Sequence, residues 1–239
     1  MQGLKQYEKL AIQAAQIGAK ILHGYFRKIE KFDLKRSGGF VTKADMESEE
    51  AISDFFHKKT PEFSILAEEN GLQEKKKVSA GKNKKNSPSG KWIIDPLDGT
   101  TNFFHKIPHY NISIALEVEG KVVVGVVYNP VTKEVYHTTL GGGAYKNNKR
   151  IHVSKNKDLS KAIIGTGFAY MNEKIFNKHI EFFKRFTKHT HGLRRFGAAA
   201  LDMCYVAAGI YDGFYEETLS PWDIAAGSLL IKEAGGKLT

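Results

Sequence analysis

The sequence predicts an α+β chain in which layers of helices alternate with layers of sheet. Apolar residues recur at helical spacing over residues 4–29 and 44–57, which predicts two helices near the start of the chain. Runs rich in Val, Ile and Thr follow at 111–118, 122–128 and 135–139. Such runs, separated by turns, are typical of an antiparallel meander. From about residue 151 onward strand and helix patterns alternate, so we expect a second half of α/β character.

The elements of this second half are shorter. We expect a strand over 162–168, a helix over 173–188, an extended segment at 192–196 and a helix over 198–208. Met203 and Cys204 fall on the apolar face of the last helix and are predicted core residues. Three histidines, His179, His189 and His191, show no ligand spacing, so we predict that they are exposed or satisfied side chains.

Length and composition limit the class of protein. The chain has 239 residues, of which 41% are hydrophobic, enough for one large domain or two closely packed ones. No apolar run reaches the length that spans a bilayer, and the amphipathic start of the chain does not resemble a signal peptide. Cys204 is the only cysteine, which excludes disulfides within the chain and leads us to expect a cytoplasmic protein.

The net charge of +10 raises the question of a nucleic acid or a membrane surface as partner. Much of the excess lies in the lysine-rich segment 75–91, which also contains Gly, Ser and Asn. A nucleic-acid surface more usually interleaves aromatic residues for stacking, and this segment has none. We therefore predict a solvated loop there.

The stretch Trp92–Phe103, WIIDPLDGTTNF, places chemistry directly after a buried strand. Pro96 fixes its φ angle, so we expect the strand to stop at Asp95. Asp98, Gly99 and Thr100 then form a turn rich in helix-capping residues, whose backbone N–H groups could hold an anion. The motif thus predicts two carboxylates beside an anion site.

Carboxylates this close to a phosphate would repel it unless divalent cations lay between them. Carboxylate oxygens, with no Cys or His at ligand spacing, favour Mg²⁺ over Zn²⁺. The stretch therefore indicates metal-assisted phosphoryl chemistry. The alternative is that Asp95 and Asp98 are ordinary turn residues, because Asp, Pro and Gly are what turns use.

The string DPLDGTTNF closely resembles the first signature of the inositol monophosphatase family, Mg²⁺-dependent, lithium-sensitive sugar phosphatases. Trp222–Gly227, WDIAAG, resembles the second signature of the same family. AEENG at 67–71 and VTKAD at 41–45 resemble two further motifs, in the family's order. The resemblance implies a hydrolase with the αβαβα sandwich fold of that family.

The resemblance also implies roles for individual residues. The implied metal ligands are Glu68, Asp95, the Leu97 carbonyl, Asp98 and Asp223, holding two or three Mg²⁺ ions. Glu68, Asp95 and Thr100 are the implied catalytic residues, with Glu68 and Thr100 orienting the attacking water. Asp45 would hold Thr100 in position without taking part in the reaction itself, although a simple helix cap explains an Asp there equally well.

On the substrate side, the resemblance implies contacts from Asp98, Gly99, Thr100, Ala199 and Glu216. Glu216 would bind hydroxyl groups of the sugar, and Gly197 and Ala198 would let the backbone approach it. Ala198 stands where the family commonly has Ser or Thr. The alternative for the alanines is tight helix packing, because Ala is the best helix former.

We expect the substrate to be a small sugar or polyol phosphate, with myo-inositol 1-phosphate first. Relatives suggest fructose-1,6-bisphosphatase, histidinol-phosphatase, NADP phosphatase or 3′(2′),5′-bisphosphate nucleotidase as alternatives on the same fold. A rival of another class is a regulatory module that binds RNA or the transcription machinery through its basic surface.

We divide the chain into an N-terminal α+β half, residues 1–150, with the main metal site, and a C-terminal α/β half, residues 151–239, which completes the metal and substrate sites. The resemblance leads us to expect a homodimer. The family normally continues beyond KEAGGKLT with another strand or two, so we expect either a truncated chain or a second sheet without that edge.

Overall fold

The computed structural model describes residues 2–34, 40–74, 89–168 and 173–239. Most of the lysine-rich segment 75–91, for which we predict a loop, therefore lies outside the described residues. None of the helices in the described ranges combines the length and the apolar character that crossing a bilayer requires.

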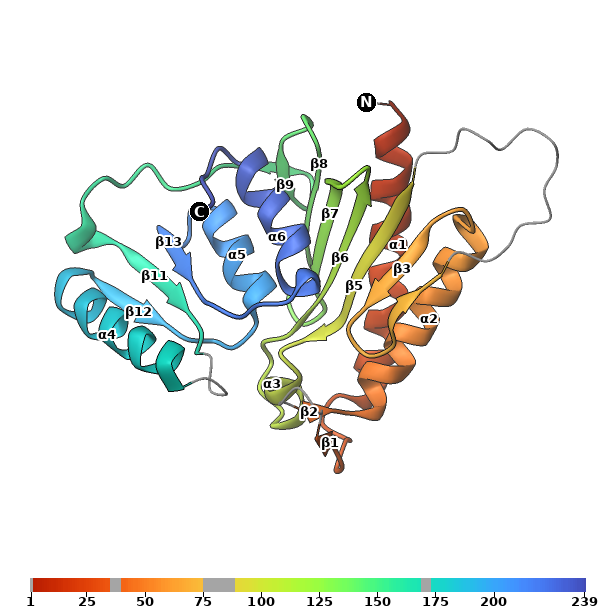
Figure 1. Ribbon diagram of the computed structural model, residues 1–239, viewed down its shortest axis with the longest axis horizontal. Helices are drawn as coiled ribbons and strands as arrows, with labels where there is room; N and C mark the ends of the chain where they lie inside the picture. The colour runs from red at the N-terminus through yellow and green to blue at the C-terminus, as the bar shows by residue number, and fades with distance from the viewer. Residues whose placement is uncertain (1, 35–39, 75–88, 169–172) are drawn as a thin grey trace.

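The largest element is an eight-stranded sheet with strand order β10-β9-β8-β7-β6-β5-β3-β4 (Figure 1). The strand bounds in that order are Lys149–Ile151, Ala144–Lys146, Glu134–Thr139, Lys121–Asn129, Asn111–Val118, Gly90–Asp98, Ser64–Ala67 and Gly71–Gln73. Only the β3–β5 pair of this sheet is parallel. The predicted antiparallel meander, β6–β7–β8, is confirmed.

Two long helices, α1 (Gln2–Tyr25) and α2 (Lys43–Lys59), cover one face of the sheet. The helices α5 (Ala199–Ala207) and α6 (Pro221–Glu233) cover the other face (Figure 1). Both faces of the central strands are thus buried, which agrees with the nearly continuous apolar runs in the sequence.

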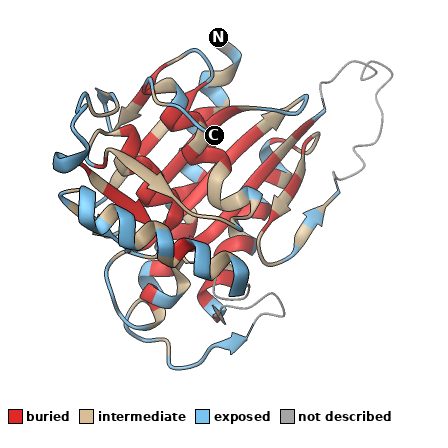
Figure 2. Ribbon diagram, turned by 60° about the vertical axis from the view of Figure 1, so that its left-hand side comes forward, coloured by how far each residue is buried: buried red, intermediate tan, exposed pale blue. Residues whose placement is uncertain are grey.

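A second, three-stranded parallel sheet packs on the far side of α5, with order β12-β11-β13. Its strands are Gly192–Arg194, Ile163–Thr166 and Gly213–Tyr215. The outermost helix, α4 (Glu173–His189), packs on β12 and exposes most of its surface (Figure 2). Helix, sheet, helix, sheet and helix therefore follow one another, which confirms the predicted layered α+β class.

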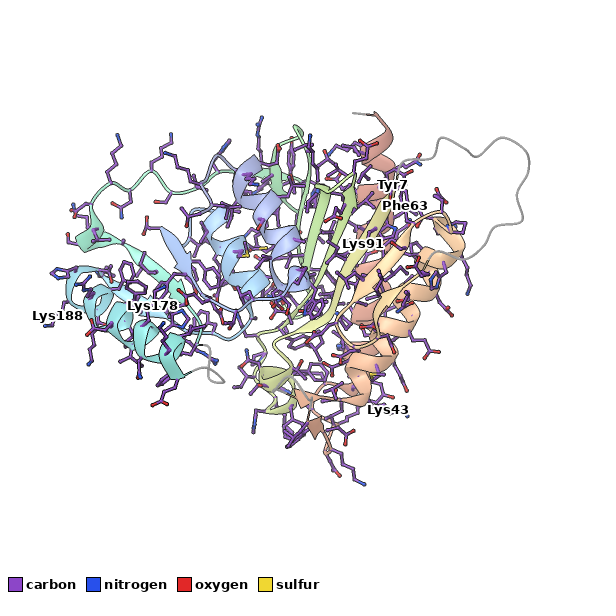
Figure 3. The ribbon with its side chains drawn as sticks, in the orientation of Figure 1. Tyr7, Lys43, Phe63, Lys91, Lys178 and Lys188 are labelled. Atoms are coloured by element: carbon purple, nitrogen blue, oxygen red, sulfur yellow. The ribbon has the colours of Figure 1, made fainter. Side chains whose placement is uncertain are left out.

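Aromatic packing anchors α1 and α2 to the sheet. The Trp92 ring of β5 stacks on Phe56 of α2 with 4.0 Å between centroids, and the Trp92 Nε1–H donates to Thr60 Oγ1 at 2.9 Å. Tyr7 of α1 lies beside Phe63, with 5.5 Å between ring centroids (Figure 3). A large ring with a satisfied polar atom both buries area and sets its own orientation.

One strand departs from its predicted end. The strand β5 does not stop at Asp95 but continues through Pro96 to Asp98. A β-bulge lies between Asp95 and Asp98, because Asp95 pairs with Ser113 while Asp98 pairs with Asn111. Proline has no N–H to donate to a strand ladder, and a bulge is one of the few places where a strand tolerates it. The expectation that Pro96 ends the strand was therefore wrong.

Several short strands were not predicted. They are β1 (Asp33–Leu34), β2 (Phe40–Val41), β4 and β13. Their lengths of two or three residues are too short for a hydrophobic period. The short helix α3 (Thr100–Phe104) begins at the predicted turn of helix-capping residues, with Gly99 as its N-cap. The division into halves 1–150 and 151–239 stays a prediction, and one buried cluster joins Ile93 and Val127 of the first half to Leu201 and Leu230 of the second.

The helix α6 approaches β7 closely because Gly125 has no side chain. A Cβ at Gly125 would lie 2.8 Å from the carbonyl oxygen of Ala226 and 3.1 Å from its Cα. Backbone atoms cannot give way as a flexible side chain can, so the helix would have to shift. Gly125 is thus a packing requirement of the layered fold.

We predict that Gly125→Ala lowers the free energy of unfolding by about 1–3 kcal/mol, the usual cost of overpacking a core. Urea denaturation followed by circular dichroism measures the change. The matched control is Gly24→Ala in α1, where an added Cβ meets nothing within 4 Å; it should be neutral or slightly stabilising. Equal effects of the two substitutions would contradict the packing argument.

Candidate active site

The acidic residues of the site come from strand ends and a helix start. Glu68 directly follows β3, while Asp95 and Asp98 lie in the last part of β5. Because β3 and β5 are parallel neighbours, their carboxyl ends meet at the same edge. Asp223, in the first turn of α6, reaches the same place from the other face of the sheet.

Asp95 is the most buried member of this group, with 1% of its surface exposed. Burial raises the pKa of Asp95 well above its ordinary value, and the charges of neighbouring carboxylates raise it further. These neighbours are Glu68, Asp98 and Asp223. Asp95 is therefore close enough to all three of these carboxylates to be repelled by them.

Asp98 is held from two sides. The Asn111 side-chain amide donates to Asp98 Oδ2 at 2.7 Å, and the backbone N–H of Ala200 donates to the same oxygen at 2.8 Å. Burial raises the pKa of Asp98 to about 6, although these hydrogen bonds act to lower it. Asp98 thus joins β5 to the start of α5.

Asp45 connects the start of α2 to Thr100. Its carboxylate accepts a hydrogen bond from the Thr42 backbone N–H at 2.9 Å, as the third helical residue of a capping box does. Its other oxygen accepts from Thr100 Oγ1 at 2.9 Å. Thr100 Oγ1 also lies 3.0 Å from the Leu97 carbonyl oxygen. The cap and the support of Thr100 are therefore the same carboxylate.

Glu49, which the sequence reasoning missed, fixes the turn that carries Glu68. This buried side chain of α2 accepts hydrogen bonds from the backbone N–H groups of Glu69 and Asn70 at 2.8 and 3.0 Å, and from the Asn70 amide at 2.8 Å. An acidic residue on the apolar side of α2 was the signal that could have revealed it.

Asp223 is positioned by its own helix. The Ser220 backbone N–H donates to Asp223 Oδ2 at 2.6 Å, and Ser220 and Asp223 form a capping box at the start of α6. Ser113 of β6 donates to the Trp222 carbonyl oxygen at 3.1 Å, which ties this helix start to the sheet. The WDIAAG motif therefore places its carboxylate through a helix cap.

Gly99 is needed where the chain leaves β5. Its φ of 92° lies in the left-handed region, which favours glycine. A Cβ there would lie 3.1 Å from the His109 carbonyl oxygen and 3.4 Å from both the Gly197 carbonyl oxygen and the Ala198 Cβ. The predicted substrate-side residues Gly99, Gly197 and Ala198 are therefore brought together, although they lie about a hundred positions apart in the sequence. The backbone of Ala199 lies beside Asp98.

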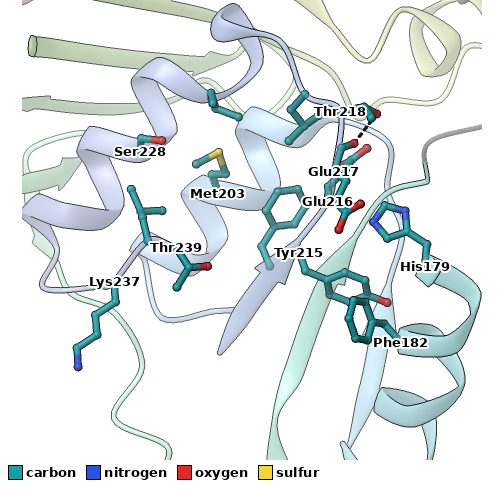
Figure 4. Close-up of a pocket in the computed structure, with 14 residues that line it drawn as sticks. His179, Phe182, Met203, Tyr215, Glu216, Glu217, Thr218, Ser228, Lys237 and Thr239 are labelled. Atoms are coloured by element: carbon teal, nitrogen blue, oxygen red, sulfur yellow. Dashed lines mark hydrogen bonds between the residues drawn. The ribbon is translucent and has the colours of Figure 1, made fainter. Parts of the chain in front are cut away.

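Glu216, just after β13, lines a cavity of about 560 Å³ (Figure 4). Burial raises the pKa of Glu216 to about 7, and the charges of Asp98 and Asp223 contribute.

His179 also lines this cavity and is completely buried. Neither of its ring nitrogens has a hydrogen-bond partner among the residues described, so the prediction that His179 is exposed or satisfied was wrong.

The acidic group is chemically suited to hard divalent cations. Four carboxylates and a backbone carbonyl are oxygen donors, the ligands that Mg²⁺ prefers. Their mutual repulsion at Asp95 would be relieved by a cation. Across the described ranges, no three His, Cys, Asp or Glu side chains already converge on one point as a ready metal site. The donor set fits, and cation binding would draw the side chains together.

Asp202 of α5 is a further buried acid that the sequence reasoning passed over. It is 1% exposed. Burial, with the negative charges of Asp98 and Glu216, raises the pKa of Asp202 to about 8. The neutral carboxylic acid is therefore the form that the fold favours at neutral pH.

Comparison with known proteins agrees with this geometry. The model of the inositol monophosphatase family matches residues 4–239. An inositol-1-monophosphatase of Rhizobium meliloti is 41% identical over 227 residues, covering 94% of this chain and 82% of that protein. Nus factor SuhB of Pasteurella multocida is 39% identical over 229 residues, covering 95% of this chain and 82% of that protein. The chain belongs to the inositol monophosphatase family, a family of phosphatases.

Solved structures show the same fold. The extragenic suppressor protein suhB from Bartonella henselae superposes with a TM-score of 0.85 at 37% identity, covering 95% of this chain and 84% of that one. An inositol monophosphatase from Anabaena gives a TM-score of 0.83 at 38% identity, covering 98% and 84%. The predicted family and its sandwich fold are thus confirmed.

We predict that Asp202 makes the fold less stable at alkaline pH. Its folded pKa of about 8 lies above the unfolded value, so its contribution to stability is fully present below about pH 4 and is lost as the pH rises through about 8. Asp202→Asn should flatten the fall of the unfolding free energy between pH 5 and 9, measured by urea denaturation without metal.

The matched control is Asp54→Asn on the exposed side of α2, which should leave that slope unchanged. If Asp202→Asn and the wild-type protein lose stability in parallel over this pH range, the buried acid does not have the raised pKa.

Proposed function

We propose that the protein is a Mg²⁺-dependent phosphomonoesterase that hydrolyses a small sugar or polyol phosphate, with myo-inositol 1-phosphate as the first candidate. One observation carries the proposal: three carboxylates crowd around the buried Asp95, next to a glycine turn that begins a helix. Membership of a phosphatase family supports it.

The residues that would hold the ions are Glu68, Asp95, the Leu97 carbonyl, Asp98 and Asp223, for two or three ions. Bound Mg²⁺ supplies positive charge for the phosphate and lowers the pKa of the attacking water. Lithium sensitivity is part of the proposal, because the family resemblance implies it.

Thr100 and Glu68 are proposed to orient the attacking water. The Thr100 hydroxyl donates its proton to Asp45 or Leu97, so its oxygen is left to accept a hydrogen from water. The Glu68 carboxylate accepts the second hydrogen and can take the proton as the water attacks phosphorus. Hydrogen bonds hold the segments that carry Thr100 and Glu68 in place. Both side chains therefore stay aligned with the attacking water.

The backbone at Gly99 and Thr100 is proposed to bind phosphate oxygens, and Ala199 and Glu216 to contact the leaving group. Asp98 is proposed to serve both as a metal ligand and as a contact to the substrate. The rival substrates, fructose 1,6-bisphosphate, histidinol phosphate, NADP and 3′-phosphoadenosine nucleotides, share the ester chemistry and differ in this leaving group. A panel of these phosphates therefore tests the reaction and the substrate together.

We predict that Asp95→Asn lowers the turnover number by about 10²–10³-fold, the usual loss when one electrostatic group at a reaction centre is removed. Phosphate release from the panel should need Mg²⁺, stop with EDTA and fall with lithium. Because the variant removes a buried repulsive charge, its melting temperature without metal should not fall. The control is Asp54→Asn. Near-normal turnover of Asp95→Asn at saturating Mg²⁺ would falsify the assignment.

The relatives named Nus factor SuhB favour a second candidate function, binding of RNA or of the transcription machinery. The formal charge of +10 is compatible with it. We predict that any RNA binding weakens steeply with salt and is unchanged in Asp95→Asn, because phosphate contacts rather than the acidic pocket would carry it. Filter binding at two salt concentrations measures this, and a salt-independent affinity would exclude the electrostatic mode.

We further propose that the protein acts in the cytoplasm as a homodimer. The buried, single Cys204 agrees with a reducing compartment. Light scattering of the purified protein measures the oligomeric state directly.

A further inference from the structure

The carboxyl end of the three-stranded sheet lies beside the candidate active site, because the charges of Asp98 and Asp223 act on Glu216, directly after β13. The strands are parallel, with Arg194 opposite Gly165 and Tyr215 opposite Thr166. The next residues along the three strands are Arg195, Gly167 and Glu216. In open parallel sheets, ligands bind outside the carboxyl ends of the strands.

Gly167, on the central strand of the three, makes room for the Glu216 carboxylate. A Cβ at Gly167 would lie only 2.0 Å from the carboxylate carbon and 2.0 and 2.1 Å from its two oxygens. The carboxylate of Glu216 therefore lies over β11. Since β11 separates β13 from β12, Glu216 reaches from its own strand toward the side where Arg195 stands.

Arg195 approaches the same place from β12. Its Nη1 atom lies 2.9 Å from where a Cβ of Gly197 would be, and the Gly197 carbonyl oxygen packs against Gly99. The guanidinium thus lies beside Gly197, whose carbonyl oxygen contacts the glycine turn proposed to bind phosphate. The Arg195 charge also acts to lower the pKa of Glu216, against burial and the charge of Asp98, which raise it.

Arg194, the neighbouring residue, faces elsewhere. Its Nη1 donates to the Leu193 carbonyl oxygen at 2.8 Å, and the side chain lines a different cavity with Tyr205 and Tyr211. The two adjacent arginines therefore have different surroundings. The chain thereby offers a matched control.

We propose that Arg195 is a specificity-determining residue that, together with Glu216, receives the leaving alcohol of the substrate. The inference rests on the proposed phosphomonoesterase function and specifies the class of leaving group. A guanidinium only donates hydrogen bonds and a carboxylate only accepts them, so the pair matches adjacent hydroxyl groups. Their opposite charges favour a neutral, hydroxyl-rich leaving group over one with a second phosphate.

The test compares Arg195→Gln and Gly167→Ala with the wild-type protein. The added methyl in Gly167→Ala should displace the Glu216 carboxylate, because the atoms it meets are the far end of a flexible side chain. For myo-inositol 1-phosphate with Mg²⁺, KM should rise about tenfold or more in both variants, the loss expected for a hydrogen bond to a charged group, with a smaller change in kcat.

Two controls separate this role from a merely structural one. Hydrolysis of p-nitrophenyl phosphate, whose leaving group has no adjacent hydroxyls, should keep its kcat/KM in both variants. Arg194→Gln should behave as the wild-type protein with both esters. Equal losses on the two esters, or no rise of KM for the inositol ester, would overturn the proposal.

Fructose 1,6-bisphosphate tests the class of leaving group. A larger loss of kcat/KM for this ester than for the inositol ester in Arg195→Gln would show that the guanidinium binds a second phosphate, and would also overturn the proposal. Similar or smaller losses support the neutral subsite.

A binding measurement separates failure of the inference from failure of the proposed function. Isothermal titration with Mg²⁺ compares myo-inositol 1-phosphate with inorganic phosphate. Wild-type protein that releases no phosphate but binds the ester more tightly than phosphate, with that preference lost in Arg195→Gln, would refute the proposed function and keep the subsite. If the ester binds no more tightly than phosphate, the subsite is refuted.

Discussion

Repulsion among acidic side chains around Asp95 is the constraint on which much of the structure depends. A carboxylate that is 1% exposed and faces three others would destabilise the fold unless protons, hydrogen-bond donors or cations offset the charge. The chain supplies donors where it can, through Asn111 and the Ala200 N–H at Asp98. A divalent cation bound beside Asp95 would offset the repulsion that remains there. Cation binding would therefore also stabilise the folded protein.

The two sheets position different parts of the proposed site. The ends of β3 and β5 bring the acidic group and the glycine turn, whereas the ends of β11, β12 and β13 bring Arg195 and Glu216. Helices α5 and α6 lie between the sheets and connect the parts, because Ala200 contacts Asp98 and Asp223 begins α6. If Arg195 and Glu216 have the roles that we propose, changes in the smaller sheet would alter which alcohol fits without disturbing the groups proposed to act on phosphorus.

Sequence reasoning found the residues that lie in short, contiguous motifs. Asp95, Asp98 and Asp223 stand in strings whose neighbours, a proline, glycines and helix-capping residues, reveal the backbone around them. It missed Glu49, Asn111 and Asp202, because each gains its meaning from a partner far away in the chain, and no local pattern marks such a partner. The layered α+β fold class could be predicted from the spacing of apolar residues along the long helices and strands. Strands of two or three residues are too short to show such a spacing.

The bulge in β5 has a consequence for how the motif tolerates changes of length. Side chains alternate along a regular strand, so residues three positions apart, such as Asp95 and Asp98, would point to opposite faces of the sheet. The extra residue at the bulge resets this phase, and both carboxylates repel Glu68 from the same side. A single residue inserted between Asp95 and Asp98, with the bulge kept, would send one carboxylate to the opposite face of the sheet, so the spacing of the motif is as strict a requirement as its composition.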